Sequence, residues 1–138
     1  MYVVIAGCGR VGSSLAKQLA GEGHEVCIID ENPDALSLLG EDFAGQFVIG
    51  QAIDWEVLRK AHLERADAYV TATDGDNTNI VSAQIAHEHF KVSCCVARVY
   101  DPLRAELFAT TGIRTVCPTK DAKDLLHEAV SSCQIPGV

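Results

Sequence analysis

The chain has 138 residues, of which 48% are hydrophobic and 22% charged, which is the composition of one globular domain with a core of its own. Eleven basic against nineteen acidic residues give a formal net charge of −8 at pH 7. This balance argues against a nucleic-acid-binding protein, which needs a basic face to neutralise phosphates.

Six short apolar runs alternate with six helical patterns along the chain. Strands are expected at YVVIAG (2–7), EVCIID (25–30), QFVIG (46–50), AYVTAT (68–73), VSCCVARV (92–99) and TVCP (115–118). Helices are expected at 11–20, at NPDALSLLG (32–40), at DWEVLRKAHL (54–63), at 77–89, at PLRAELFATTG (102–112) and at KDAKDLLHEAVSS (120–132). Pro33 suits a first helical turn, Gly40 suits a helix end, and Asp54 suits an N-cap.

Strands that are apolar on both faces and separated by helices indicate a parallel sheet covered on each side. With right-handed crossovers, this order predicts an α/β fold: a Rossmann-like doubly wound parallel sheet of six strands in the order 3-2-1-4-5-6. We expect one nucleotide-binding domain over residues 1–130. Residues 131–138 are expected to form a tail, because QIPGV has the composition of a linker cut short.

A glycine turn, GCGRVG, lies between the first strand and the first helix, with glycines at Gly7, Gly9 and Gly12. The first permits a tight turn, the second lets the backbone approach a pyrophosphate, and the third lets helix and strand pack closely. An acid, Asp30, follows at the end of the second strand, 18 residues past Gly12. This strand, turn, helix and acid together predict a dinucleotide site.

Asp30 is expected to accept hydrogen bonds from the adenosine ribose and to repel a 2′-phosphate, which favours NAD(H) over NADP(H). ATP and ADP present the same ribose, so they remain candidates beside NAD(H). Asp30 also lies where it could cap the next helix. Together with the adjacent Glu31 it is a candidate cofactor-binding residue.

Arg10 stands inside the glycine turn, where a guanidinium could fork onto phosphate oxygens. A domain that senses phosphate number would use such a charge, whereas a dehydrogenase does not need it there. A solvated surface arginine is the other interpretation, and the residues alone do not separate the two.

The sequence offers no catalytic pair for an oxidoreductase. A Tyr-x-x-x-Lys pair is absent, since YDPLR ends in Arg104, and the six strand–helix units leave no chain for a substrate domain. His87 and His89 stand two apart on a helix and make a poor metal pair. The six cysteines include no Cys-x-x-Cys pair and read as reduced and mostly structural, so we expect neither an enzyme nor a metal site.

No apolar run approaches the roughly 18 residues of a membrane span. The start, MYVVIAGCG, has no basic leader and no small-residue cleavage site. A cytoplasmic protein is therefore expected.

The chain resembles the N-terminal nucleotide-binding domain of the Trk/Ktr potassium-uptake regulators, also called the RCK N-terminal domain. The resemblance rests on VVIAGCGRVGSSLAKQLAGEGHEVCIIDENPD, FVIGQAIDWEVLRKA, ADAYVTATDGDNTNIVSAQIA, VARVYDP and TVCPTKDA, and it runs from about residue 1 to residue 129. It implies a regulatory subunit, not an enzyme, that binds NAD(H) or ATP/ADP. It also implies a homo-oligomer, a dimer or larger ring, under a membrane potassium-transport subunit, at the inner face of the cell membrane and touching the membrane only through that partner.

The resemblance also implies the site residues. The turn from Gly7 to Val11 would hold phosphates, Thr73 and Asp74 would line the cleft, and Arg98 would reach toward the nucleotide or a neighbouring subunit. The cofactor-binding set expected from the motif and the resemblance together is Gly7, Cys8, Gly9, Arg10, Val11, Gly12, Asp30, Glu31, Asp54, Thr73, Asp74 and Arg98.

One departure concerns the segment after the third strand, where the family usually reads Gly-Asp-Ala-Thr-Asp and this chain reads GQAID. Gln51 lacks the charge and Ile53 lacks the hydroxyl of the usual adenine-side contacts, while Asp54 still matches. Two other functions stay open from the sequence. One is the cofactor domain of an NAD-dependent oxidoreductase without its substrate domain, and the other is a sensor for a different effector, such as an ion exchanger.

Overall fold

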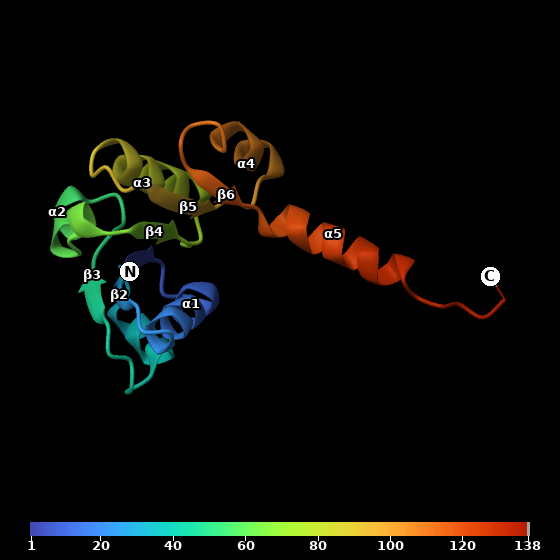
Figure 1. Ribbon diagram of the computed structural model, residues 1–138, viewed down its shortest axis with the longest axis horizontal. Coiled ribbons are helices and arrows are strands. Elements are labelled where there is room, and N and C mark those ends of the chain that lie inside the picture. The colour runs from blue at the N-terminus through green and yellow to red at the C-terminus, as the bar shows by residue number, and fades with distance from the viewer. Residues whose placement is uncertain (138) are drawn as a thin grey trace.

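The computed structural model describes residues 1–137, and within them six parallel strands form one sheet in the order β3-β2-β1-β4-β5-β6. The predicted fold class and strand order are confirmed. The strands are β1 (Tyr2–Ala6), β2 (Glu25–Asp30), β3 (Gln46–Ile49), β4 (Ala68–Thr71), β5 (Cys94–Arg98) and β6 (Arg114–Val116). The central strand, β1, is fully buried and pairs with β2 and β4 in parallel register (Figure 1).

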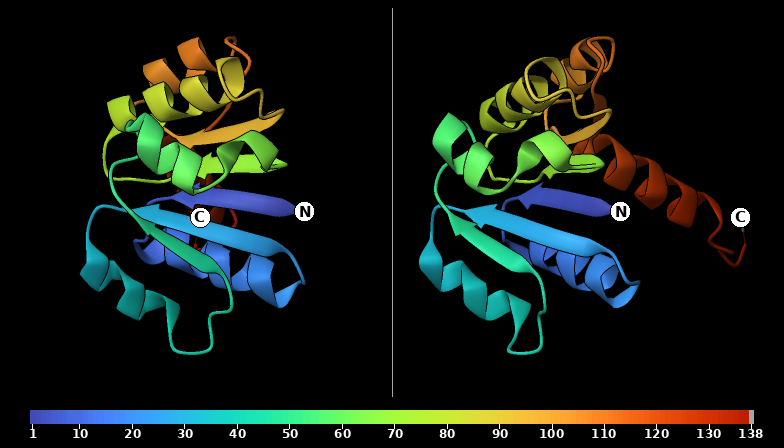
Figure 2. Two further views of the ribbon diagram at one scale, coloured as in Figure 1. Left: turned by 90° about the vertical axis from the view of Figure 1, so that its left-hand side faces the viewer. Right: turned by 60° about the vertical axis from the view of Figure 1, so that its left-hand side comes forward.

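Helices cover both faces of the sheet, as Figure 2 shows. On one face, α1 (Arg10–Gly21) and the 3₁₀ helix η1 (Pro33–Leu39) pack on one set of side chains from β1 and β2. On the other face lie α2 (Trp55–Lys60), η2 (Leu63–Arg65), α3 (Asp76–Glu88) and α4 (Pro102–Phe108). Successive strand residues point to opposite faces, so β1 and β2 contribute to both cores, which is why β1 is apolar throughout and β2 is apolar between its two end residues.

Three of the expected helices differ clearly from the sequence-based boundaries, and one of them, expected over 102–112, is α4 and ends at Phe108. The segment at 32–40 forms the 3₁₀ helix η1: the Asn32 side chain caps the Asp34 N–H, and Gly40, at a φ of +80°, ends it after seven residues. The helix expected over 54–63 is capped by Asp54 as predicted but stops at Lys60. His62 takes the left-handed conformation, at a φ of +53°, and this breaks the helix before η2.

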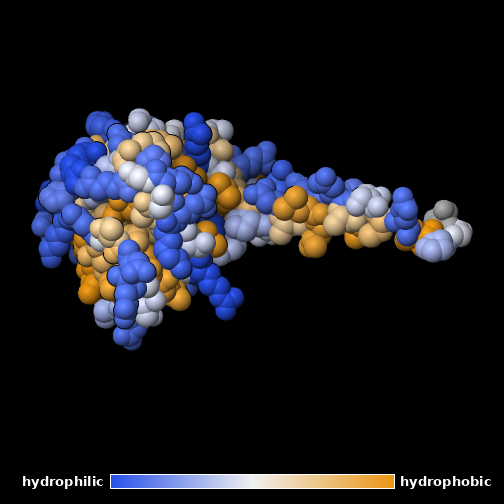
Figure 3. All heavy atoms as spheres, turned by 60° about the horizontal axis from the view of Figure 1, so that its bottom comes forward, coloured by the Kyte–Doolittle hydropathy of each residue, from blue (hydrophilic) through white to orange (hydrophobic). Residues whose placement is uncertain are grey.

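The last helix, α5 (Pro118–Ser131), projects away from the rest of the domain (Figure 1), and none of its residues is buried. Leu125, Leu126 and Val130 are 65%, 67% and 70% exposed. Apolar atoms are visible along this helix in Figure 3. An amphipathic helix normally buries its apolar stripe, so α5 presents a surface that its own domain does not cover.

Among residues 1–137, no helix is both long enough and apolar enough to span a bilayer.

Candidate functional site

A cleft of about 840 Å³ opens at the carboxyl ends of the strands. Its walls are the segments that follow β1, β2, β3 and β4. The connection from β1 leads to β2 on one side of β1, and the connection from β3 returns to β4 on its other side, so the strand order reverses at β1. In doubly wound folds this switch point is where a ligand binds.

The glycine turn forms the floor of the cleft. Gly7 has a φ of +106°, and a Cβ on it would collide with the Ala72 backbone of the neighbouring strand's loop. A Cβ on Gly12 would collide with the Gly7 carbonyl oxygen, so α1 could not pack against the turn. Apart from Gly9 itself and its two chain neighbours, no protein atom within residues 1–137 lies within 4 Å of where a Cβ on Gly9 would stand. These are the three roles expected of the glycines, with the space beside Gly9 left for a ligand.

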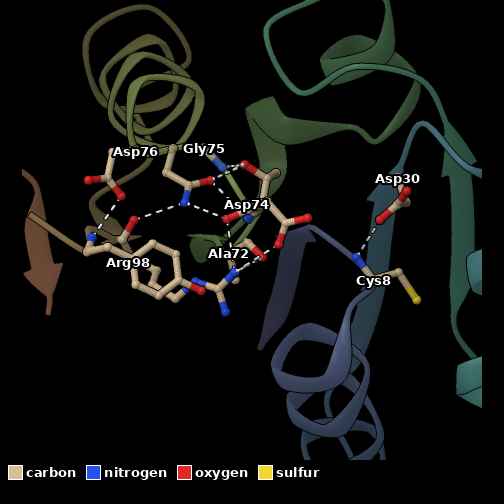
Figure 4. Close-up of polar contacts among 10 residues, drawn as sticks. Cys8, Asp30, Ala72, Asp74, Gly75, Asp76 and Arg98 are labelled. Carbon is tan, nitrogen blue, oxygen red and sulfur yellow. Dashed lines mark hydrogen bonds and ion pairs between the residues drawn. The ribbon is translucent and has the colours of Figure 1, made fainter. Parts of the chain in front are cut away.

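Asp30 lies at the end of β2 and faces the glycine turn (Figure 4). Its Oδ2 accepts a hydrogen bond from the Cys8 N–H at 2.7 Å, and its Oδ1 accepts one from the Asn32 N–H at 2.8 Å. A carboxylate has about four acceptor sites, so capacity for ribose hydroxyls remains. The N-cap of η1 is Asn32, not Asp30, so the alternative role of Asp30 as the helix cap is wrong.

The Cys8 side chain lines the same cleft from the buried side of the turn. Its Sγ donates to the Ala35 carbonyl at 3.3 Å. Burial, together with the nearby Asp30 charge, raises the pKa of the Cys8 thiol. The thiol therefore stays protonated and acts as a small apolar group with a weak donor.

The loop after β4 forms the opposite wall, with Thr73 and Asp74. The buried Asn79 of α3 holds Thr73 in place: its Oδ1 accepts from the Thr73 N–H at 2.9 Å and from the Thr73 hydroxyl at 2.6 Å. Asp76, the first residue of α3, accepts from the N–H groups of Tyr100 and Asp101 at 2.8 and 3.0 Å. The ends of β4 and β5 are thus joined by side chains from one helix.

Arg98 is not among the residues that line the cleft. Its Nη2 donates to the carbonyls of Ala72 and Thr73 at 3.0 and 2.9 Å, with the carboxylate of Asp74 at 4.0 Å (Figure 4). Its Nε is buried and donates to no atom of residues 1–137. Arg98 therefore supports the wall of the cleft from behind.

The loop after β3 closes the remaining side, with Gln51, Ala52 and Ile53. Its start is tied to the neighbouring strand, since the Gly50 N–H donates to the Asp30 carbonyl at 3.0 Å. Its end is tied by Asp54, whose side chain accepts from the Glu56 N–H at 2.9 Å. Gln51 and Ile53 stand where the resembled family usually has an aspartate and a threonine. This wall therefore presents the amide of Gln51 and the apolar surfaces of Ala52 and Ile53.

The cleft brings together seven of the twelve expected residues: Gly7, Cys8, Gly9, Asp30, Glu31, Thr73 and Asp74. The other five do not line it: Arg10, Val11, Gly12, Asp54 and Arg98. Gly12 lets α1 pack against the turn and the Asp54 side chain caps α2, as described above, whereas Arg10 and Val11 are exposed at the start of α1. Lining residues outside the expected set include Asn32, Ala35, Leu38, Gly50, Ala52 and Thr78. Ala35 and Leu38 come from η1 and Thr78 from α3, whereas the others come from loops, and in the sequence only their proximity to the motif's acid and threonine points to them.

A six-stranded parallel sheet with a glycine turn facing an acid across its switch point defines the Rossmann-like class of nucleotide-binding domains. Residues 3–119 match the family model of the TrkA-N domain, and the chain belongs to that family.

A relative named Trk system potassium uptake protein TrkA, from Streptomyces coelicolor, is 44% identical over 124 residues, which cover 90% of this chain and 56% of the relative. A Mycobacterium tuberculosis protein of the same name is 38% identical, and the match covers 95% of this chain and 60% of that protein. The chain therefore spans somewhat more than half the length of these curated relatives.

Among solved structures, the Kef CTD of Shewanella denitrificans in AMP-bound form has a TM-score of 0.78 at 26% identity and covers 95% of this chain, with 80% of that chain matched. The GsuK channel bound to NAD has a TM-score of 0.70 at 22% identity, with 85% of this chain and 21% of that chain covered. At that identity the second likeness shows the fold alone.

Proposed function

We propose that this chain is the nucleotide-binding domain of a regulatory subunit of a potassium-uptake system. In this role it binds NAD(H), or alternatively ATP or ADP, in the cleft, and carries out no chemistry on the nucleotide. Membership of the TrkA-N family, relatives named as potassium uptake proteins, and an AMP-bound structural neighbour support this proposal.

The observation that carries it is the contact between Asp30 and the Cys8 N–H across the mouth of the glycine turn. It fixes an acceptor for ribose hydroxyls beside backbone N–H groups at the start of α1, where the helix dipole favours an anion. The open space at Gly9 lets phosphates approach that backbone. A phosphate–ribose unit therefore matches the cleft in both charge and position.

The regulatory step is a population shift. Two nucleotides that make different contacts in the cleft stabilise different arrangements of the subunits, and that difference moves a membrane partner. In this proposal the chain is cytoplasmic, forms a homo-oligomer, and acts at the inner face of the membrane through the potassium-transport subunit. The uncovered apolar side of α5 supports the homo-oligomer.

Calorimetric titration of the purified chain with NADH, NAD⁺, NADPH, ATP and ADP tests the binding step. We expect saturable one-site binding of NADH or of ATP and ADP, and loss of that binding in Gly9→Val, whose side chain fills the space left for phosphate. The matched control is Gly21→Val, since a Cβ at Gly21 also meets no protein atom of residues 1–137 and lies at the far end of α1. If none of the five ligands binds, the proposal is wrong.

The gating step needs the membrane partner. Ion flux through a reconstituted transport subunit, measured with and without the regulatory protein and each nucleotide that binds, is expected to depend on which nucleotide is present. Flux that responds to the protein but not to the nucleotide would contradict the regulatory role of the cleft.

A further inference from the structure

A buried chain of three groups connects the sheet to the loop after β3. Tyr69, in β4, and Ser82, in α3, have hydroxyl oxygens 2.6 Å apart. The Ser82 hydroxyl in turn lies 2.6 Å from the Ala52 carbonyl oxygen. Tyr69 and Ser82 are fully buried, and Ala52 is nearly so.

The direction of these hydrogen bonds follows from counting protons. A carbonyl only accepts, so the single Ser82 proton is donated to Ala52, and the Tyr69 hydroxyl must donate to Ser82. Burial raises the pKa of Tyr69 well above its ordinary value, so this phenol keeps its proton. Both hydroxyls are thereby committed, and the Ala52 carbonyl is held toward α3.

Holding that carbonyl also orients the next peptide N–H. The Ala52–Ile53 peptide is trans, like every peptide among the described residues, so its C=O and N–H point in opposite directions. The Ile53 N–H is therefore directed away from α3, and within residues 1–137 it donates to no protein acceptor. Ile53 itself lines the cleft, with its side chain about half exposed.

This loop lies where the base of a bound nucleotide is expected. Asp30 marks the ribose position, and the glycine turn marks the phosphates on one side of it. β3 pairs with β2 with Ile49 opposite Asp30, so the loop after β3 is the wall next to the ribose on the side away from the glycine turn. The apolar side chains of Ile53 and Leu38 line the cleft there and match the faces of a flat base.

We propose that Ser82 is a positioning residue for nucleotide binding: through its hydrogen bond to the Ala52 carbonyl it holds the loop of Gln51, Ala52 and Ile53 as the wall against which the adenine base packs. This inference rests on the proposed function. Ser82 touches no ligand itself, and its effect falls on the base and not on the phosphates.

The test compares a ligand that has a base with one that lacks it. ADP binding is measured by calorimetry, and pyrophosphate binding by its competition with ADP, for the unaltered chain and for Ser82→Ala. We expect Ser82→Ala to weaken ADP by about three- to tenfold, the effect of one neutral hydrogen bond, and to change pyrophosphate by less than about twofold.

Thr71→Val is the matched control. Thr71 is as buried as Ser82, and its hydroxyl also bonds a backbone carbonyl, that of Asn79, at 2.9 Å, but it does not reach the loop after β3. It is expected to cost stability without changing the ratio of ADP to pyrophosphate affinity. Ser82→Cys, which keeps a weak donor in nearly the same volume, is expected to lose less ADP affinity than Ser82→Ala and replaces it if the alanine variant does not fold.

Each outcome decides between the two proposals. If the unaltered chain binds none of NADH, NAD⁺, NADPH, ATP and ADP, the proposed function fails and this inference with it; if it binds NADH but not ADP, NADH replaces ADP in the same comparison. If it binds ADP, and Ser82→Ala binds ADP equally well or loses ADP and pyrophosphate by the same factor, Ser82 does not position the base and only this inference is overturned.

Discussion

Asn79 holds Thr73 by both of its hydrogen-bonding groups. Its Oδ1 accepts from the Thr73 N–H and hydroxyl, and its Nδ2 donates to the Thr73 carbonyl at 3.0 Å and to the Arg98 carbonyl at 2.9 Å. One fully buried amide thus joins α3 to the ends of β4 and β5. Thr73 lines the cleft, so the rigidity of that wall depends on a residue that does not face the ligand.

Replacing Asn79 should therefore be costly. Asn79→Ala leaves the Thr73 N–H without its acceptor and removes the amide donor to the Thr73 and Arg98 carbonyls, the first of which keeps its bond from Arg98 Nη2. We expect the free energy of unfolding to fall by about 2–4 kcal/mol. Urea titration followed by circular dichroism measures it. Asn77→Ala is the control on the same helix, because Asn77 is exposed and its side chain, within residues 1–137, bonds the Arg104 guanidinium and no other group. If Asn79→Ala lowered the free energy of unfolding as little as Asn77→Ala does, this account would be contradicted.

The strand order could be predicted because the strands carry a simple signal. β1 and β2 are apolar at nearly every position, which only a sheet covered on both faces explains, and parallel crossovers leave few arrangements. Helix ends were less predictable. Gly40 ends η1 as its type indicates, but the 3₁₀ geometry of η1 was not predicted, and α2 stops at Lys60 because of the backbone conformation at His62, which has no signature in a single sequence.

The geometry of the candidate site was predictable where its residues belong to one sequence motif. The places of Gly7, Gly9 and Gly12 follow from their spacing because their roles are set by the backbone, and that of Asp30 follows because the end of β2 brings its carboxylate to the turn. Arg98 was not, because its support of the β4 loop depends on how β5 pairs beside β4. The same holds for Ser82 and the loop after β3, since contacts across 30 residues of sequence leave no local pattern.

The buried thiols should make stability fall at alkaline pH. Burial raises the pKa of Cys95 from 9.0 to about 12 and also raises that of Cys27. Below pH 9 the thiols are protonated in both the folded and the unfolded chain, so they add no pH dependence. Above pH 9 the unfolded chain releases the Cys95 proton and the folded chain keeps it, so the free energy of unfolding falls as pH rises toward 12, by up to about 1.4 kcal/mol per pH unit for Cys95, and Cys27 adds to the fall in the same direction.

Urea titrations at pH 7, 8, 9 and 10 measure this slope. Cys95→Ala should make it shallower above pH 9 even though the variant is less stable at every pH. Cys133→Ala, which removes an exposed thiol, should leave it unchanged. Equal slopes in all three proteins would show that the buried thiols do not cause the loss.

Asp30 should discriminate against the 2′-phosphate of NADPH. A phosphate placed next to this carboxylate meets a like charge in a cleft, at a cost on the order of a few kcal/mol. We expect NADPH to bind at least about tenfold more weakly than NADH in calorimetric titration. Asp30→Asn keeps the size of the side chain and one acceptor for the Cys8 N–H, and it should reduce the preference for NADH over NADPH. The control, Glu31→Gln, should keep a larger preference for NADH than Asp30→Asn does. Equal affinities for NADH and NADPH in the unaltered chain would mean that Asp30 does not face the ribose.

The uncovered side of α5 should be a subunit contact. Light scattering at tens of micromolar is expected to give at least a dimer, because Leu125, Leu126 and Val130 lie exposed on one side of the helix. Leu126→Glu places a charge in that contact and should shift the mass toward the monomer. Ser131→Glu adds the same charge on the other side of α5 and should not. A monomeric mass for the unaltered chain would count against the homo-oligomer.

Arg10 is expected to read phosphate number, although its side chain does not line the cleft. It starts α1 at the glycine turn, is exposed, and makes no side-chain hydrogen bond or ion pair with any of residues 1–137. Its guanidinium is therefore available to fork onto a phosphate. The contact of a terminal phosphate depends most on this charge, so Arg10→Ala should lower the affinity for ATP more than the affinity for ADP. One charge-assisted contact corresponds to roughly 1.5–3 kcal/mol, about tenfold to a hundredfold in affinity.

NADH supplies the internal comparison, because its two linked phosphates are held mainly by the backbone N–H groups of the turn and it should lose less than ATP. Asp30→Ala should instead weaken ATP, ADP and NADH alike, since all three present the same ribose hydroxyls. Lys17→Ala, which removes an exposed cation farther along α1, should change none of them. Calorimetry with the three ligands decides the role of Arg10: if Arg10→Ala lowers all three affinities by one factor, Arg10 is a general phosphate anchor and does not sense phosphate number.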